Sequence, residues 1–188
     1  VQNSVGAIKK LYATGNKHNR SVKSVGFKLF YHHPRNDSHE QFWNFISREA
    51  ELRVIHLKRL NKLRTYVSLC LATKYNIWQK WVANEDECRE SPIELERAAT
   101  LEFLQKLSRW EQNTDSLFRS VPILNISYED FINNPQYILK QCQKFISIDD
   151  VKILPLQLLQ QHPQPLSQLI SNFNEVRSWE FVQPWIND

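Results

Sequence analysis

The stretch RVIHLKRLNKLRTYVSL, residues 53–69, decides how this chain folds. Its apolar run at 54–57 predicts a short buried strand, and a helix is predicted from about residue 61 to residue 75. A basic turn joins the two elements. At the carboxyl end of a strand in an α/β sheet, guanidinium groups, hydroxyls and helix N–H groups can converge on one phosphate. The stretch therefore marks a candidate anion site.

Two interpretations of this basic segment stay open from the residue types. Cations after a strand are commonly a solvated face, and a serine such as Ser68 is often only a tolerated helix residue. In the second interpretation the basic turn together with Arg64 and Ser68 holds one phosphate, because a guanidinium supplies two parallel donors and a hydroxyl adds another. Hydrogen bonds to charged groups are worth about 1.5 to 3 kcal/mol each, so losing Arg59 would weaken binding about ten- to a hundredfold.

The rest of the chain continues a strand and helix order that favours a parallel sheet covered by helices. Strands are predicted at residues 25–31, 54–57 and 121–127. Helices are predicted at residues 7–12 with an end at Gly15, at 38–52 with Ser38 as cap, at 61–75, after Ser91, from 134–135, and at 166–179. The long helix after Ser91 rests on a capping box, in which Pro92 takes the first helical position and Glu94 closes the box.

Length and composition favour one domain over residues 1–188, because 188 residues with 41% apolar content can build one substantial core. The formal charge of +4 comes from 24 basic and 20 acidic side chains. This mild surplus of positive charge favours binding of an anion, but nucleic-acid-binding proteins usually carry a denser basic surface. No nucleic-acid partner is therefore expected. No run has the length of a transmembrane helix.

Cysteine usage points to a reducing compartment. Cys70, Cys88 and Cys142 are odd in number and lack the C-x-x-C spacing of a zinc knuckle. No cluster of histidines and carboxylates has metal-ligand spacing either. We therefore expect no disulfide framework, no metal and a cytoplasmic location.

Three segments carry a resemblance to a known family. They are GFKLFYH at 26–32, the 54–68 segment, and ILNISYEDF at 123–131, and they occur in the family's order. Together they resemble sulfotransferases that use 3′-phosphoadenosine 5′-phosphosulfate (PAPS), and within this family they resemble the bacterial carbohydrate sulfotransferases. The resemblance implies an α/β fold with a P-loop-NTPase-like parallel sheet flanked by helices. It also implies that Arg59 and Ser68 hold the 3′-phosphate of the nucleotide.

Two departures from the family pattern matter. The first is the loop rich in Arg, Ser, Gly and Thr that wraps the 5′-phosphosulfate, for which residues 14–21 have suitable types but no preceding strand. We expect the sequence to begin downstream of that loop, so the fold is incomplete at its N-terminus. The second is spacing, since Arg59 and Ser68 are one residue further apart than in the eukaryotic cytosolic enzymes. Either Arg59 reaches from an extra turn residue or Arg64 supplies part of the contact.

The function implied is transfer of a sulfuryl group from PAPS, as co-substrate, to a hydroxyl of a small-molecule, carbohydrate or glycolipid acceptor. An alternative is a non-catalytic nucleotide- or anion-binding module of the same fold. A nucleic-acid-binding domain has only charge in its favour. The oligomeric state and the acceptor are not readable from the residues.

Sulfuryl transfer to an alcohol needs a base, and the family places its acceptor pocket near the end of the 26–32 segment. His32 and His33 follow there, and an imidazole titrates near neutral pH. The alternative for this pair before a proline is ordinary loop chemistry. Glu40 is a lesser candidate base, because some family members use a carboxylate.

Lys28 and Trp78 are candidate substrate contacts. Lys28 points at substrate or extends to a sheet edge, and the two alternatives are balanced. Trp78 is placed beyond the phosphate helix to act as a sugar platform or an adenine stacker, while simple packing is the other role open to it. For Tyr128 and Glu129 a structural role at a strand exit is favoured.

Overall fold

The computed structural model describes residues 4–18, 23–33, 39–81, 91–148, 152, 158–159 and 162–186. The chain divides into two compact units. Unit 1 comprises Val1–Lys58 and Trp110–Ile153, and unit 2 comprises Arg59–Arg109 and Leu154–Asp188. Each unit is described by itself below, and one domain over residues 1–188 stays a prediction.

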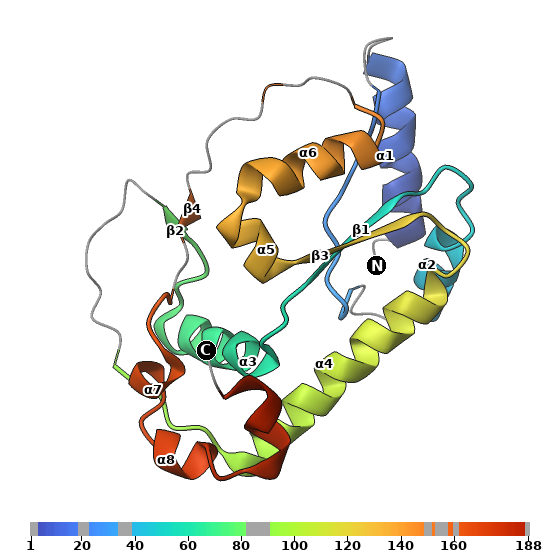
Figure 1. Cartoon of the computed structure of the whole chain (residues 1–188). Helices are drawn as coiled ribbons and strands as arrows, with labels where there is room; N and C mark the ends of the chain where they lie inside the picture. Colours follow the sequence, from blue (N-terminus) through green and yellow to red (C-terminus); the bar gives the residue numbers. More distant parts are fainter. Residues whose placement is uncertain are drawn as a thin grey trace. The chain divides into compact units, whose positions relative to one another are not determined.

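A two-stranded parallel sheet runs through unit 1 (Figure 1). Strand β1, Val54–Lys58, pairs with strand β3, Ile123–Ser127, in a register that matches Val54 with Ile123 and Lys58 with Ser127. Two of the three predicted strands are therefore present, and the mixed α/β class with a parallel sheet flanked by helices is confirmed. The carboxyl ends of both strands meet at the pair Lys58 and Ser127.

The helices of unit 1 are α1 (Ser4–His18), α2 (His39–Ile46), α5 (Tyr128–Asn133), α6 (Pro135–Phe145) and the C-terminal part of α4 (Arg97–Leu117). They form where local signals place them: Ser127 caps α5 by accepting from the backbone N of Asp130, and Pro135 opens α6 behind Asn134. One cluster of buried side chains packs α1, α2 and the turn after α4 together, and it consists of Ile8, Phe42, Ile46, Phe118 and Val121.

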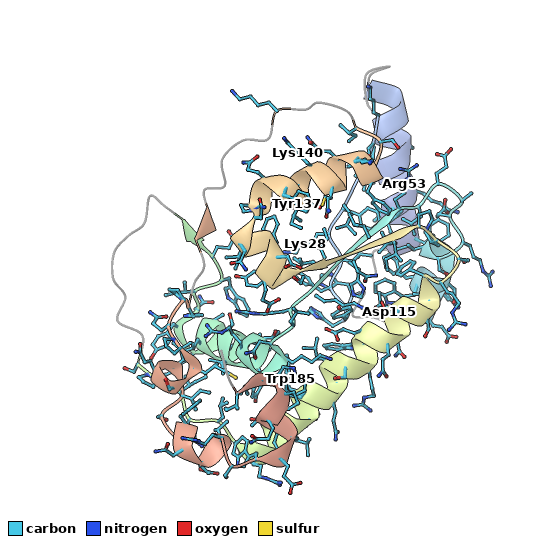
Figure 2. The ribbon with its side chains drawn as sticks, viewed as in Figure 1. Lys28, Arg53, Asp115, Tyr137, Lys140 and Trp185 are labelled. Carbon is cyan, nitrogen blue, oxygen red and sulfur yellow. The ribbon has the colours of Figure 1, made fainter. Side chains whose placement is uncertain are left out.

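Arg53 ties the start of β1 to the end of α6. Its guanidinium donates to the backbone carbonyl of Phe145 and, at 2.9 Å, to the hydroxyl of Ser147. The last carbonyls of a helix have no partner within the helix, so a cation at this end satisfies one of them. Figure 2 labels Arg53 among the side chains of this unit.

Unit 2 is mainly helical. Its elements are α3 (Lys62–Tyr75), the N-terminal part of α4, the antiparallel pair β2 (Lys80–Trp81) and β4 (Leu158–Leu159), the short helices α7 (Leu166–Leu169) and α8 (Phe173–Val176), and the 3₁₀ helix η1 (Glu180–Trp185). Its core lies between α3 and the C-terminal segment, and its least exposed side chains include Leu63, Leu71, Leu166, Val176 and Val182.

The predicted strand at 25–31 is wrong. The described residues 23–30 have no regular secondary structure, and a turn follows at Tyr31 and His32. The backbone groups of Phe30 are used locally: its carbonyl accepts from the N–H of His33 at 2.9 Å, and its N–H points at the His33 ring. This local pairing replaces a sheet ladder.

The capping box at Ser91 is also wrong, since α4 begins at Arg97. Residues 91–96 are not helical, and Ile93 among them bonds by its N–H to Leu169 O and by its carbonyl to Ser171 N. The cap is supplied instead by the Glu96 carboxylate, which accepts from the backbone N of Ala98 and Ala99. Tertiary pairing of Ile93 thus overrides the local signal.

Three helix boundaries differ from the predictions. α1 continues through Gly15 to His18, and α2 ends at Ile46, since residues 47–52 bond as tight turns. The single helix predicted at 166–179 is broken into α7 and α8. The break comes at Ile170, which forms a bridge with Ile93. The predicted cap Ser38 lies outside the described residues.

The prediction that β1 is a buried strand needs a correction. Ile55 and Leu57 are 41% and 51% exposed, whereas His56 between them is only 6% exposed. Among the described residues β1 has a neighbouring strand on one side only, which is β3. The polar residue, not the apolar ones, is the buried centre of this strand.

Candidate functional site

In unit 1 the side chains of Tyr31 and Asp115 contact the imidazole of His56 from its two ring nitrogens. Its imidazole Nε2 lies 2.8 Å from the hydroxyl oxygen of Tyr31, and its Nδ1 lies 3.3 Å from Oδ1 of Asp115. Tyr31 comes from the irregular segment before His32. Asp115, labelled in Figure 2, comes from the C-terminal part of α4. Three segments distant in sequence therefore meet at one imidazole.

The partners of His56 assign its tautomer. A carboxylate only accepts, so the 3.3 Å contact with Asp115 favours the tautomer with its proton on Nδ1, in which Nε2 accepts from the Tyr31 hydroxyl. The order carboxylate, imidazole, hydroxyl is that of groups that activate a nucleophile or a base. No sequence pattern predicted this arrangement.

Lys58 anchors the carboxylate end of the chain. Its ammonium lies 2.8 Å from Oδ2 and 2.9 Å from Oδ1 of Asp115. Lys58 is two residues after His56 on β1, so the two side chains point to the same face of the strand. Asp115, at 47% exposure, reaches water, and its partners are both on one strand.

The electrostatics of the cluster favour a neutral imidazole. Burial lowers the pKa of His56, and the positive charge of Lys58 lowers it further, although Asp115 and Glu111 oppose the shift. Burial raises the pKa of the Tyr31 phenol well above its usual range, and Glu111 and Asp115 add to this. For Asp115, burial pushes the pKa up, but the hydrogen bond and charge of Lys58 outweigh it and the pKa is lowered. At neutral pH the cluster therefore holds a phenol, a neutral imidazole and a carboxylate.

His32 and His33, the predicted catalytic residues, sit beside this cluster within unit 1. Their rings contact each other at a centroid distance of 4.7 Å, and the His32 ring stacks on Phe30 at 5.6 Å. Trp110 contacts His32 at 6.3 Å and stacks on Tyr31 at 5.8 Å. The two histidines and the His56 cluster thus share one aromatic neighbourhood. His32 is exposed and His33 is half-buried.

Lys28, a predicted substrate contact, is exposed with its ammonium 4.6 Å from the centroid of the Phe30 ring. This cation–π contact holds the lysine at the same aromatic surface. Glu40, the lesser candidate base, is exposed in the first turn of α2.

The predicted phosphate ligands all belong to unit 2. Arg59 follows directly after β1 and is half-buried, and Ser68 is half-buried on α3. The helix before Ser68 is closed at its N-terminus by Asn61, whose side-chain oxygen accepts from the backbone N of Arg64 at 2.9 Å. The strand, turn and helix predicted for the 53–69 segment are present.

Arg64 has structural partners within unit 2. Its guanidinium donates to the carbonyl oxygens of His162 at 2.9 Å and Gln164 at 3.0 Å. These bonds tether the chain segment before α7 to α3. Two of the five donors of Arg64 are therefore already committed to backbone.

Trp78 lies just beyond the end of α3 and is strongly exposed, with its indole N–H donating to the side chain of Asn76 at 3.1 Å. Asn76 itself ends α3 in the left-handed region at φ 54°. The exposed indole face is open to a planar or sugar ring.

The sequence carried one usable signal for the missed cluster. A histidine flanked by apolar residues in a strand, with a lysine two residues later on the same face, marks a buried polar pair. Tyr31 and Asp115 carry no comparable signal, because only the fold brings them to β1.

Among the described residues, no group of three or more histidines, cysteines and carboxylates has a geometry that suits a metal ion. Nor does any helix in the described ranges combine the length and apolar character needed to span a membrane. Comparison of the chain with family models, with curated proteins and with solved structures finds no match.

Proposed function

We propose that this chain is part of a PAPS-dependent sulfotransferase with a P-loop-NTPase-like fold, which transfers a sulfuryl group to a hydroxyl of a carbohydrate or glycolipid. Arg59 and Ser68 bind the 3′-phosphate of the nucleotide in this proposal, and His32 or His33 serves the acceptor side. The observation that carries it is the local fold of the 53–69 segment: strand β1, then Arg59, then a capped helix α3 with Ser68 in its second turn.

The chemistry of this segment supports the proposal. A guanidinium just after a strand and a hydroxyl on the following helix are donors that suit a phosphate. Arg64 supports a narrower assignment, because its bonds to the carbonyls of His162 and Gln164 give it a structural task. We therefore assign the 3′-phosphate to Arg59 and Ser68 in the first place.

The test is binding of 3′-phosphoadenosine 5′-phosphate, measured by calorimetry and by the rise in melting temperature of the protein. Adenosine 5′-monophosphate, which lacks only the 3′-phosphate, is the matched ligand. We expect the bisphosphate to bind more tightly, and Arg59→Ala to remove about ten- to a hundredfold of that advantage. Arg59→Lys should restore little of this affinity, because an ammonium lacks the two parallel N–H donors of a guanidinium.

Arg119→Ala is the matched control variant, since Arg119 is exposed in the turn after α4 and its loss changes the net charge equally. If Arg119→Ala weakens binding as much as Arg59→Ala, the effect is general electrostatics and the phosphate site is wrong. Equal affinity for the two nucleotides in the unchanged protein would also contradict the proposal. Binding of the bisphosphate without sulfuryl transfer from PAPS would favour the non-catalytic module.

A further inference from the structure

We propose that Tyr31 is an activated phenol that exchanges a proton with an acceptor hydroxyl, with His56 and Asp115 as the groups that activate it. This inference rests on the proposed function, because it names the proton acceptor on the alcohol side of that reaction. It departs from the sequence-based expectation, which gave this role to His32 or His33.

The first argument is the order of the contacts. The Tyr31 oxygen lies 2.8 Å from Nε2 of His56, and Asp115 occupies the other ring nitrogen at 3.3 Å. A carboxylate on Nδ1 orients the ring and stabilises the imidazolium that forms when Nε2 takes a proton. Lys58, at 2.8 Å, keeps that carboxylate ionised and in place.

The second argument is the pattern of burial along the chain of groups. The imidazole in the middle is 6% exposed, the carboxylate at one end is 47% exposed, and the phenol at the other end is half-buried. A purely structural histidine needs one partner for each nitrogen and no route to water. Here the hydrogen bond from Tyr31 and the 3.3 Å contact with Asp115 place groups that reach the surface on both sides of the buried imidazole, as a path for a proton requires.

The third argument is the surroundings of the phenol. Trp110 stacks on Tyr31, and the Phe30 ring and the His32 ring, both exposed, form a stack next to it in the chain. Aromatic faces beside polar groups suit the alternating apolar and hydroxyl surfaces of a sugar ring. The substrate class that fits is an uncharged alcohol of this kind.

The proposed step is balanced as follows. The acceptor oxygen forms a bond to sulfur while the bond from sulfur to the nucleotide phosphate oxygen breaks. The acceptor proton passes to the Tyr31 oxygen as the Tyr31 proton passes to Nε2 of His56. The resulting imidazolium pairs with Asp115 and later returns its proton to solvent. Tyr31 is the catalytic residue, and His56 and Asp115 are positioning residues.

The test uses the reactivity of the phenol and needs no nucleotide. Benzenesulfonyl fluoride is added to the full chain, and labelled tyrosines are quantified by peptide mass spectrometry. The Tyr31 oxygen attacks sulfur, the bond from sulfur to fluorine breaks, fluoride leaves, and His56 takes the phenolic proton. We expect Tyr31 to label faster than Tyr137, which is 56% exposed and serves as the control inside the same molecule (Figure 2).

Variants separate activation from simple access. We expect His56→Gln to lower the Tyr31 labelling rate at least about tenfold, in line with the loss of a general base, and Asp115→Asn to lower it less. Tyr137 labelling should not change in either variant. Because His56 is buried and its loss can unfold unit 1, the exposed Asp115 provides the second variant, and an unchanged Tyr137 rate and circular dichroism spectrum check the fold.

The pH profile gives a signature that a structural role would not produce. Labelling of Tyr31 should rise while His56 loses its proton, below about pH 6.5, and then stay level through neutral pH. A phenol with no base beside it labels through its phenolate and keeps rising toward about pH 10. The charged and titrating groups that face His56 are Lys58, Asp115, Glu111 and the phenol itself.

Three results would overturn the inference: Tyr31 labelling no faster than Tyr137, equal Tyr31 labelling in the wild type and both variants, or a Tyr31 rate that climbs steadily to pH 10. The outcome is independent of nucleotide binding. A reactive Tyr31 in a protein that ignores 3′-phosphoadenosine 5′-phosphate would refute the proposed function and leave the activated phenol standing. An inert Tyr31 in a protein that binds the nucleotide would do the reverse.

Discussion

The side-chain amide of Asn172 bonds to both backbone groups of Leu95: its Oδ1 accepts from the Leu95 N–H and its Nδ2 donates to the Leu95 carbonyl, each at 3.0 Å. The side chain thereby copies one rung of a β ladder. Two residues earlier in each segment, Ile93 and Ile170 form a parallel bridge. The residues before α4 are held to the segment at residues 170–172 by this double contact.

Asn172→Ala should therefore destabilise the protein. The substitution strands a donor and an acceptor of the buried Leu95, and each unsatisfied group costs about 1 to 3 kcal/mol. Asn172→Asp keeps the acceptor and loses the donor, so its free energy of unfolding should lie between those of the wild type and Asn172→Ala. Urea unfolding followed by circular dichroism measures the difference. Asn174→Ala, an exposed change in α8, is the control, and an equal loss there would contradict the special role of Asn172.

Arg64→Ala should loosen the segment before α7. Its guanidinium holds the carbonyls of His162 and Gln164, so the amides of Gln168 and Ile170 just beyond should exchange hydrogen faster when it is removed. Mass spectrometry of amide exchange gives the measurement. If exchange is unchanged while affinity for 3′-phosphoadenosine 5′-phosphate falls as in Arg59→Ala, Arg64 is a ligand contact and not a tether.

Asn61→Ala should shorten α3 and lower the free energy of unfolding by about 0.5 to 2 kcal/mol, the usual cost of removing a cap. Asn61 also donates to the carbonyl of Trp185 at 3.0 Å, so a serine or an aspartate at this position restores the cap but not that bond. Asn61→Asp should therefore recover only part of the loss. Full recovery would show that the Trp185 bond contributes nothing.

The stability of the protein should fall as the pH drops below about 6.5. The pKa of His56 is lowered in the folded state by burial and by Lys58, so the unfolded chain binds more protons in this range. The contribution is fully present above the unfolded pKa and is lost as the pH falls toward the folded value. Denaturation at a series of pH values measures it.

The control for this pH dependence is His56→Gln, which removes the titrating group and should flatten the curve between pH 5 and 7, values chosen to bracket the ordinary histidine pKa of about 6.5. The lowered pKa of Asp115 acts in a separate window, since its contribution is lost only as the pH falls below about 3.9. A curve that stays sloped in the glutamine variant would assign the effect to another group.

Local signals in the sequence predicted the strand, turn and helix of the 53–69 segment, and the strand predicted at 121–127 is found at 123–127. Both depend on short-range rules: an apolar run, a polar cap and the first turns of a helix. The parallel sheet followed from strand and helix order, whereas the register of β1 with β3 was not predicted. The sequence could not predict the start of α4, because Ile93 chooses its partner, Ile170, from far along the chain.

The candidate site shows the same limit. Arg59, Ser68 and the two histidines were proposed from the family resemblance and from order along the chain. Arg59 follows β1 and Ser68 lies on α3, but His32 and His33 follow an irregular segment and not the predicted strand. The contact of Tyr31 with His56 joins an irregular segment to a strand, so no hydrophobic periodicity in the sequence predicts it. The alternation of Val25, Phe27, Leu29 and Tyr31 predicted a strand, but hydrogen bonds within the turn at Phe30 and His33 replaced it.

The burial of Val176 and Val182 at 0% exposure means that the core of unit 2 needs the segment at residues 166–186. During translation, α3 and the first part of α4 leave the ribosome without the side chains that cover them. Because translation adds about 5 to 20 residues per second, the covering residues are synthesised several seconds after these helices. A premature stop codon before Leu166 would leave the apolar side chains of α3 and α4 permanently exposed. The truncated chain would then be a substrate for chaperones and proteases.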